Sequence, residues 1–371
     1  MGDTEYHRLL GIGRSAFQGL EDHLERRDYD GLEYRHVSEY RRGVERGTAL
    51  IDGDVVRGFP KVPRTLVLES GIPTAFDDEF VVEEKVNGYN IRAVRVGGEI
   101  LALSRSGMIC PFTTRMLERL VDLEALFERH PSAMVCGEVI GPENPYTAHD
   151  YPDVDSLAFR AFDWRDRRSG DPLAVRERRS RYERFDVPQT PSFGFYGIDE
   201  ADAVRTIVDR LDADGREGIV MQSSDGTMQL KYTTAASNRD DLAYAFSLPF
   251  DYGQPFMFRR LIREAFQSVE WAESESVARE RAHDLGEAIL LSMRESILTV
   301  EAGETVGERH TVRASPEAVD VLFEHLRGQG LHLEIETDRR EDDDRVVTFC
   351  KQTQATNDRI GNYLAGRVVE E

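Results

Sequence analysis

The chain has 371 residues and a formal net charge of −22, because 69 acidic residues face 47 basic ones. A hydrophobic content of 40% supports folded cores and excludes a disordered polyanion. The acidic balance argues against a protein that grips nucleic acid over its whole surface, although it leaves room for local basic patches. No apolar run reaches the length of a membrane span, so we expect no membrane partner.

The predicted elements divide the chain into about four parts. Residues 1–65 combine a helix-like start with short apolar alternations and predict a β-rich module. Residues 66–237 predict short strands and turns interrupted by amphipathic helices, one of them over 113–130, so we expect an α+β domain of antiparallel sheets. Residues 238–304 predict a helical block, and residues 305–371 predict a small α/β module.

Two regions allow two interpretations each. The helical block is either an oligomerisation element, which would make the protein a homodimer, or a cap on its own chain. Residues 160–184 contain nine arginines against five acids, which is typical either of a solvated helix face or of a binding patch.

Lysine is rare, and this makes each lysine a candidate functional residue. Lysines occur at 61, 85, 231 and 351, and the other 43 basic residues are arginines. This composition is typical of a halophile, whose charged surface stays hydrated in high salt, or of an acidic protein from an arginine-rich genome. We favour the halophile.

The cysteines and the N-terminus indicate the compartment. Cys110, Cys136 and Cys350 show no CxxC spacing and cannot all pair, so they predict buried thiols in a reducing environment. The N-terminus has neither the basic region nor the long apolar region of a signal peptide. We therefore expect a cytoplasmic protein.

Four charged residues are candidates for chemistry. No GxxxxGK[ST] motif occurs, which excludes a P-loop enzyme. Lys85 ends an apolar run before a turn, and burial or a nearby cation such as Lys231 would favour the neutral amine that a nucleophile requires; the alternative is a surface hairpin residue. Glu138 and Glu217 stand beside apolar strands, where they either cap turns or bind hydroxyls and a hard cation such as Mg²⁺.

These residues belong to an ordered set of six short motifs, which are KVNG at 85–88, SRSG at 104–107, CGE at 136–138, FDW at 162–164, EGIV at 217–220 and LKY at 230–232. The set resembles the covalent nucleotidyltransferase superfamily of ATP-dependent ligases and capping enzymes. The contexts EEKVNGYNIR, GEVIGPENPY and LKYTTAASNRDDL are most similar to the archaeal homodimeric ATP-dependent RNA ligases, also called circularising RNA ligases.

The resemblance implies an ATP-grasp-like nucleotidyltransferase domain of antiparallel sheets with helices, flanked by N-terminal, helical dimerisation and C-terminal modules. It implies catalytic roles for Lys85, Lys231 and Glu217, and metal binding by Glu217 and Glu138. The ATP-binding residues that it implies are Glu83, Lys85, Val86, Asn90, Arg105, Glu138, Phe162, Val220 and Lys231.

The implied reaction has three steps and uses ATP, Mg²⁺ or Mn²⁺, and RNA ends. Lys85 attacks the α-phosphate of ATP, which gives lysyl-AMP and releases pyrophosphate. AMP then passes to a 5′-phosphate RNA end, and a 3′-hydroxyl finally displaces AMP. Positioning, cations and a metal suit phosphoryl transfer of this kind.

Three positions depart from the wider superfamily. Asn90 replaces the arginine of many DNA ligases, which favours the RNA branch, and Gln222 stands where the fourth motif often continues into lysine. Asn87 replaces an aspartate and removes a charge beside Lys85. The alternatives are a DNA ligase, a guanylyltransferase, a non-catalytic RNA-end binding protein, or a scaffold assembled through the helical block.

Overall fold

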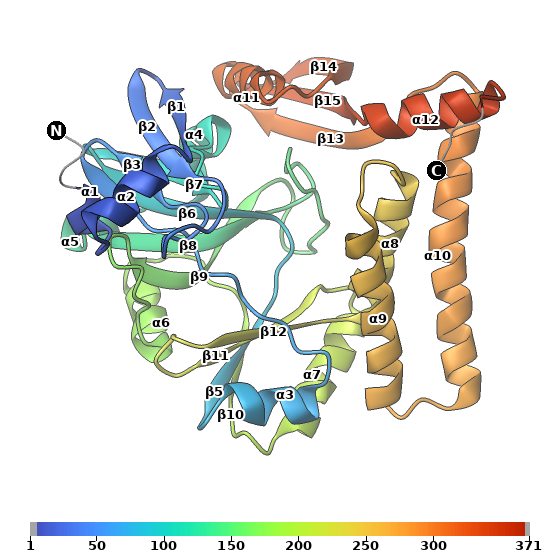
Figure 1. The fold of residues 1–371 in the computed structure, drawn as a ribbon, viewed down its shortest axis with the longest axis horizontal. Coiled ribbons are helices and arrows are strands. Elements are labelled where there is room, and N and C mark those ends of the chain that lie inside the picture. Colours follow the sequence, from blue (N-terminus) through green and yellow to red (C-terminus); the bar gives the residue numbers. More distant parts are fainter. Residues whose placement is uncertain (1–5, 368–371) are drawn as a thin grey trace.

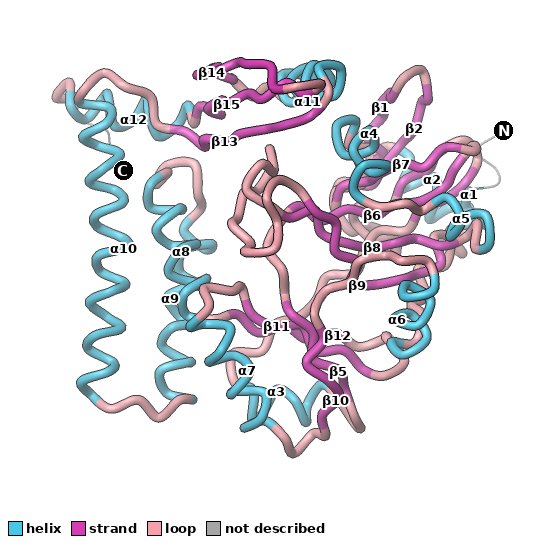
Figure 2. Tube along the Cα trace, turned by 180° about the vertical axis from the view of Figure 1, so that it is seen from behind, coloured by secondary structure: helices cyan, strands magenta, loops and turns pink. Residues whose placement is uncertain are grey.

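The structure is a computed structural model that describes residues 6–367. A two-sheet body carries the N-terminal module on one side, a column of long helices stands on the other, and the C-terminal domain lies across both (Figure 1). The view from behind shows the same arrangement (Figure 2). The expected α+β architecture of antiparallel sheets is confirmed. None of the helices in the described part of the chain is long and apolar enough to cross a membrane.

The N-terminal module is a four-stranded antiparallel sheet with two short helices. Its elements are α1 (Tyr6–Leu9), α2 (Arg14–Glu21), β1 (Leu24–Tyr29), β2 (Leu32–Val37), β3 (Ala49–Ile51) and β4 (Asp54–Val56). Arg92 fastens this module to the central sheet. Its fully buried guanidinium donates to the carbonyl oxygens of Gly47 at 2.8 Å and of Ser104 at 2.9 Å, which satisfies donors that burial would otherwise leave unpaired.

Two four-stranded antiparallel sheets form the central body. One has the order β7-β6-β8-β9, with β6 (Tyr89–Val96), β7 (Glu99–Ser104), β8 (Ala133–Ile140) and β9 (Ala158–Asp166). The other has the order β10-β5-β11-β12, with β5 (Phe80–Glu84), β10 (Ser192–Tyr196), β11 (Gly218–Ser223) and β12 (Gln229–Thr233). The flanking helices are α3 (Leu68–Ala75), α4 (Pro111–Leu120), α5 (Glu124–Arg129), α6 (Val175–Arg184) and α7 (Ala201–Ala213).

The single helix expected over residues 113–130 is wrong. It is two helices, α4 and α5, separated by residues 121–123. Val121 adopts extended backbone angles, and the Asp122 carboxylate accepts from the Glu124 amide at 3.0 Å, which starts a new helix. The apolar side chains of both helices are nevertheless buried in the body, because the break keeps them on the side of the sheets.

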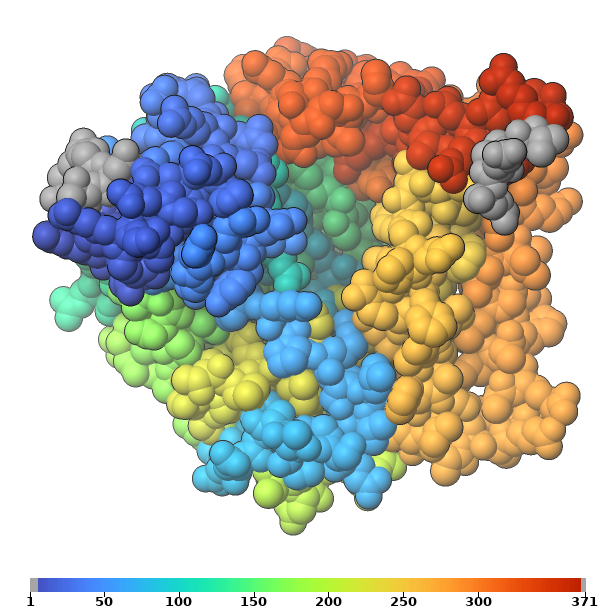
Figure 3. All heavy atoms as spheres, in the orientation of Figure 1, coloured from blue at the N-terminus to red at the C-terminus, as the bar shows by residue number. Residues whose placement is uncertain are grey.

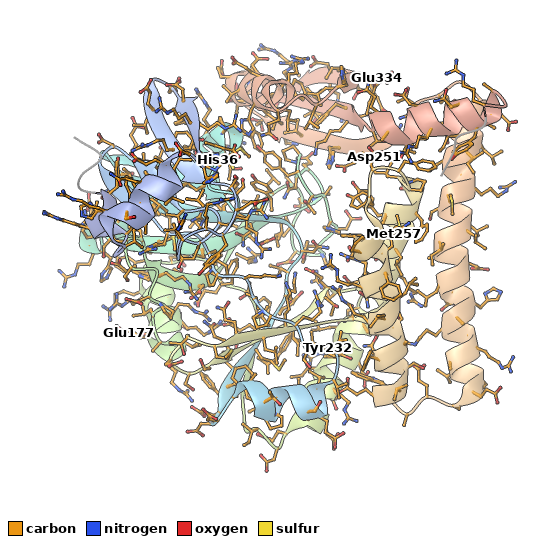
Figure 4. All side chains as sticks on the ribbon, viewed as in Figure 1. His36, Glu177, Tyr232, Asp251, Met257 and Glu334 are labelled. Atoms are coloured by element: carbon orange, nitrogen blue, oxygen red, sulfur yellow. The ribbon has the colours of Figure 1, made fainter. Side chains whose placement is uncertain are left out.

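The helical block consists of α8 (Ala235–Ser247), α9 (Gln254–Glu270) and α10 (Glu275–Glu301). It packs on the second sheet through Tyr232, which lies at the junction in Figure 4. The Tyr232 hydroxyl donates to Glu270 at 3.1 Å, and its ring stacks on Trp271 with 5.9 Å between centroids.

The C-terminal domain contains β13 (Gly307–Ala314), α11 (Pro316–Gly328), β14 (Leu333–Glu341), β15 (Asp344–Gln352) and α12 (Gln354–Leu364), with the sheet order β13-β15-β14. The Ser315 side chain accepts from the Ala318 amide at 3.3 Å and caps α11. Phe112 and Met116 of α4 enter the core of this domain, so it is anchored on the central body.

Candidate active site

The two central sheets meet around a cavity of about 150 Å³. β5, β11 and β12 supply one wall, while β6, β8 and β9 supply the other. Every residue that the motif resemblance implied for ATP binding lines this cavity, namely Glu83, Lys85, Val86, Asn90, Arg105, Glu138, Phe162, Val220 and Lys231. Antiparallel pairing explains part of this convergence, because Val220 stands opposite both Glu83 and Lys231 in register.

Lys85 lies immediately after β5, where its amide donates to the Gly218 carbonyl at 2.8 Å. Its amine contacts a carboxylate oxygen of Glu217 at 2.5 Å. The Lys85 side chain is 23% exposed, so it is held by the protein but reachable from the cavity. The geometry of an amine fixed by one contact and open to solvent fits a nucleophile awaiting a substrate.

Tyr151 fixes the turn that follows Lys85. Its hydroxyl accepts from the Asn87 amide at 2.6 Å and donates to the Asn87 carbonyl at 3.1 Å. Gly88 is required here because a Cβ atom would lie 2.2 Å from the Val139 carbonyl oxygen. The polar run at 87–88 is therefore a tightly packed turn and not a free surface hairpin.

Glu138 projects from β8 toward Lys85. Burial raises the pKa of Glu138 to about 7, with Lys85 opposing that shift and the charge of Glu217 adding to it. Asn90 donates from its side-chain amide to Glu138 at 3.3 Å. Near neutral pH this carboxyl group is therefore present in both protonation states, and it can accept from or donate to a hydroxyl group.

Lys231 lies on β12 among other cations. Burial and the charges of Arg64 and Lys85 lower the pKa of Lys231 to about 8. Residues 63–65 run parallel to β12 at this point, since the Lys231 amide donates to Pro63 at 3.0 Å and the Thr65 amide donates to Lys231 at 3.2 Å. Arg64 is not among the residues that the sequence predicted for the site, because no local pattern shows that this segment pairs with a strand so distant in the chain.

The aromatic end of the cavity contains a second ring that the motifs did not reveal. Phe162 meets Phe59 edge to face, with 5.5 Å between ring centroids, and both rings line the cavity. The N-terminal module therefore contributes to the site directly. The other lining residues that the motif roles did not include are Val62, Glu84, Thr190, Gln222 and Gln229.

The arginine-rich stretch at 160–184 is not a continuous surface patch. Arg178 is 1% exposed, and it donates to Glu83 at 2.5 Å and to Gln222 at 2.9 Å. Arg179 also donates to Glu83, at 2.6 Å. Charge reversal at Arg178 and Arg179 would therefore act on the interior of the protein, because Arg178 supports the cavity wall from behind.

Several other arginines of this stretch are also paired with carboxylates within the chain, namely Arg160, Arg165, Arg167, Arg168, Arg176 and Arg181. Gln222, which accepts from Arg178, also donates from its side-chain amide to the Gly226 carbonyl at 3.3 Å. These pairings explain why the high arginine content does not produce a free basic surface.

The carboxylates at the site suit a hard cation that also binds phosphate. Among the residues that the structure describes, no group of three or more acidic, histidine or cysteine side chains is placed to hold a metal by itself. One carboxylate oxygen of Glu217 is buried and has no hydrogen-bond partner among the described residues. The charge of Glu217 also acts on Glu138, whose pKa it raises. Mg²⁺ is commonly held by one or two carboxylates together with substrate phosphates, so these residues fit such an ion.

Known proteins match most of this chain. The RNA ligase family model matches residues 78–235, and the model of the ligase Pab1020 C-terminal region matches residues 244–367. The uncharacterized protein MJ0414 of Methanocaldococcus jannaschii is 39% identical over 343 residues, which cover 89% of this chain and 87% of that protein.

Solved structures extend the match over nearly the whole chain. An archaeal ATP-dependent RNA ligase, solved in two forms, superposes with a TM-score of 0.92 at 39% identity, and the match covers 98% of both chains. A protein of Aquifex aeolicus, provisionally described as an ATP-dependent DNA ligase, superposes with a TM-score of 0.89 at 26% identity, covering 96% of this chain and 100% of that one. The present chain therefore belongs to the family of the archaeal ATP-dependent RNA ligases.

Proposed function

We propose that this protein joins the 5′-phosphate and 3′-hydroxyl ends of RNA in three steps, with Lys85 as the nucleophile. The observation that carries the proposal is the Lys85 amine, held 2.5 Å from Glu217 in a cavity that Glu138, Arg105 and Lys231 also line. A nucleophile, cations and carboxylates in one place are what nucleotidyl transfer requires.

In the first step the Lys85 amine loses a proton to water and its nitrogen forms a bond to the α-phosphorus of ATP. The bond to pyrophosphate breaks, and pyrophosphate leaves with the electron pair. Lys231 and Arg105 hold the developing negative charge, while Phe162 and Val220 hold the adenine. Glu138 bonds to the ribose hydroxyls. In the second step the RNA 5′-phosphate takes AMP from Lys85, and in the third the RNA 3′-hydroxyl displaces AMP.

A divalent cation completes this proposal. Glu217 and Glu138 would hold Mg²⁺ or Mn²⁺ together with substrate phosphates, and the bound ion would neutralise phosphate charge. The buried Glu217 oxygen without a partner among the described residues supports this assignment.

We further propose four functional units at residues 1–65, 66–237, 238–304 and 305–371, of which the first five and last four residues of the chain lie outside the described range. A high-salt, reducing cytoplasm is the proposed setting. The net charge of −22 supports the first property, and three buried unpaired cysteines support the second. Joining of the two ends of one RNA strand, which gives a circle, is the proposed natural outcome.

The helical block is the proposed homodimer interface. Large apolar side chains are exposed along α9 and α10, namely Phe258, Phe266, Val269, Leu290, Leu291 and Leu298. Several large apolar side chains exposed on adjoining helices are typical of a protein–protein contact. The sedimentation mass of the intact chain tests this assignment.

Joining assays test the proposed function. We expect the chain, in molar KCl with ATP and Mg²⁺ or Mn²⁺, to join 5′-phosphorylated RNA, and chelation by EDTA to stop the reaction. Nicked DNA and GTP serve as the comparison substrates, because the Aquifex aeolicus relative makes a DNA ligase the second candidate. Sealing of DNA but not of RNA would reject the RNA assignment.

The pKa of Lys231 predicts a pH dependence of nucleotide binding. Because this pKa is lowered to about 8, the amine loses its charge above that pH, whereas bound phosphates would keep it protonated. We expect the affinity for α,β-methylene ATP to fall about tenfold from its maximum by one unit above the pKa of Lys231. Titration of Glu138, whose pKa is about 7, sets the acidic side of the profile.

Titration calorimetry of wild type and Lys231→Arg provides the measurement. The arginine stays charged, so its affinity should not fall over the alkaline range, whereas Glu138 titrates identically in both proteins. An equal alkaline loss in both proteins would show that another group is responsible.

A further inference from the structure

A second and larger cavity, of about 760 Å³, adjoins the 150 Å³ cavity, which we call the nucleotide cavity. The two meet at the Lys85–Glu217 pair, because Lys85 lines the nucleotide cavity and Glu217 lines the larger one. Glu217 and Asn87 line it at that end. Its remaining walls come from the loop 146–151, from α8 and the start of α9, and from β13, so we call it the interdomain cleft. The space-filling view shows a recess between the central body, the helical block and the C-terminal domain (Figure 3).

One wall of the interdomain cleft is aromatic. The ring planes of Tyr244 and Tyr252 meet at 70°, with 5.6 Å between their centroids. The ring centroids of Tyr252 and Phe256 are 5.0 Å apart. Tyr244 is 40% exposed, although its position in the cleft is fixed by the neighbouring ring. Exposed rings that are held in place suit the stacking of a nucleobase.

The charged groups of the cleft favour hydroxyl groups over phosphate. Its carboxylates are Asp150, Glu217, Asp240, Asp241 and Glu308. Its three arginines already have partners within the chain: Arg260 pairs with Asp241 at 2.6 Å, Arg309 with Glu336 at 2.8 Å, and Arg216 with Glu84 at 3.6 Å while also lying over the Tyr151 ring. Ionised carboxylates accept hydrogen bonds from hydroxyls and repel phosphate.

The far wall is held in position by the C-terminal domain. Burial would raise the pKa of Glu308, but hydrogen bonds from His310 and Tyr244 and the charge of Lys351 lower it to about 2. Glu308 therefore remains an acceptor throughout the physiological range. The Lys351 amine lies 3.7 Å from Glu308, which gives this buried lysine a structural role at the cleft.

We propose that the interdomain cleft binds the 3′-hydroxyl end of the RNA, a placement that rests on the proposed function. The terminal base stacks on Tyr244 and Tyr252, and the ribose hydroxyls donate to the carboxylates. The 3′-oxygen then faces the Lys85–Glu217 end of the cleft, where the adenylated 5′-phosphate is formed. The 3′-oxygen bonds to the phosphorus of this 5′-phosphate, and the hydroxyl proton passes to water. The bond from the same phosphorus to AMP breaks, and AMP leaves with the electron pair.

The third step can be tested alone with a chemically pre-adenylated RNA donor and a separate RNA acceptor. We expect Tyr244→Ala to raise KM for the acceptor about tenfold, because a base loses its stacking partner. The KM for the donor should stay unchanged. Tyr244→Phe should raise the KM for the acceptor much less than Tyr244→Ala, because it keeps the ring and loses only the hydrogen bond to Glu308. Tyr40→Ala is the matched control, since Tyr40 is 71% exposed and belongs to the N-terminal module.

Two results would overturn the placement. A raised KM for the donor with an unchanged KM for the acceptor would assign the cleft to the 5′ end, and unchanged values for both would show that it binds neither. Lysyl-AMP formation needs no RNA and reports whether the Tyr244→Ala protein is folded. Failure of the proposed function is distinguishable, because the wild-type chain would then join no RNA at all.

Discussion

Replacing Lys85 with alanine or with arginine is expected to abolish transfer of label from α-labelled ATP to the protein, a loss of about a thousandfold or more. Alanine has no amine, and the guanidinium of arginine stays protonated, so neither side chain can attack phosphorus. The measurement is protein-bound label after denaturing electrophoresis. Lys61→Ala is the matched control, because Lys61 is exposed and does not line the nucleotide cavity.

The same variants separate the first step from the third. Joining of a pre-adenylated RNA donor does not require an amine that attacks ATP, so Lys85→Ala should retain part of this activity. Persistent labelling in Lys85→Ala would assign the nucleophile to another residue.

The second large effect concerns stability. Arg178→Ala is expected to lower the free energy of unfolding by about 3–5 kcal/mol, because it leaves the buried Glu83 carboxylate with a single cationic partner. Urea unfolding followed by circular dichroism provides the measurement. Arg184→Ala on the same helix is the control, since Arg184 is exposed and a surface change of this kind costs about 0.5 kcal/mol or less.

This comparison also tests the position of Arg178 against the patch interpretation. A side chain that contacted RNA from the surface would weaken RNA binding when removed and leave the unfolding midpoint unchanged. That result for Arg178→Ala would contradict the buried ion pair.

The convergence of the motif residues on one cavity could be expected from the sequence, because these residues stand in short motifs at or near strands. Lys85, Glu138 and Lys231 each follow or interrupt an apolar run, so their neighbours indicate both the strand and its end. The strand register, with Val220 opposite Glu83 and Lys231, then brings distant motifs together. The residue types that this site contains therefore stand in short sequence motifs, whereas their positions relative to one another depend on pairing between distant strands.

Other features depend on pairing between distant segments and could not be predicted. Phe59 lines the cavity and Arg64 lies beside Lys231 only because their segment lies against β9 and β12. The burial of Arg178 depends on Glu83, which lies on a strand almost a hundred residues earlier. Composition gives the number of charges in a segment but does not show which of them are paired inside the protein.

The helix break between α4 and α5 has a different cause. Hydrophobic periodicity continued across residues 121–123, but a local hydrogen bond from the Glu124 amide to Asp122 competes with helical pairing. In the sequence, a polar side chain that caps a new helix looks the same as a polar side chain on the solvated face of a continuing helix. Periodicity therefore predicts the buried side of such a segment better than its continuity.

The measurement that tests the central claim most directly is peptide mapping by mass spectrometry after incubation with ATP and a divalent cation. The rarity of lysine makes the result unambiguous, since the candidates are Lys61, Lys85, Lys231 and Lys351. We expect one AMP on the peptide that contains Lys85, and we expect added pyrophosphate to remove it by reversing the first step. An AMP adduct on a peptide without Lys85, or no adduct under conditions in which RNA is joined with ATP, would contradict the central claim.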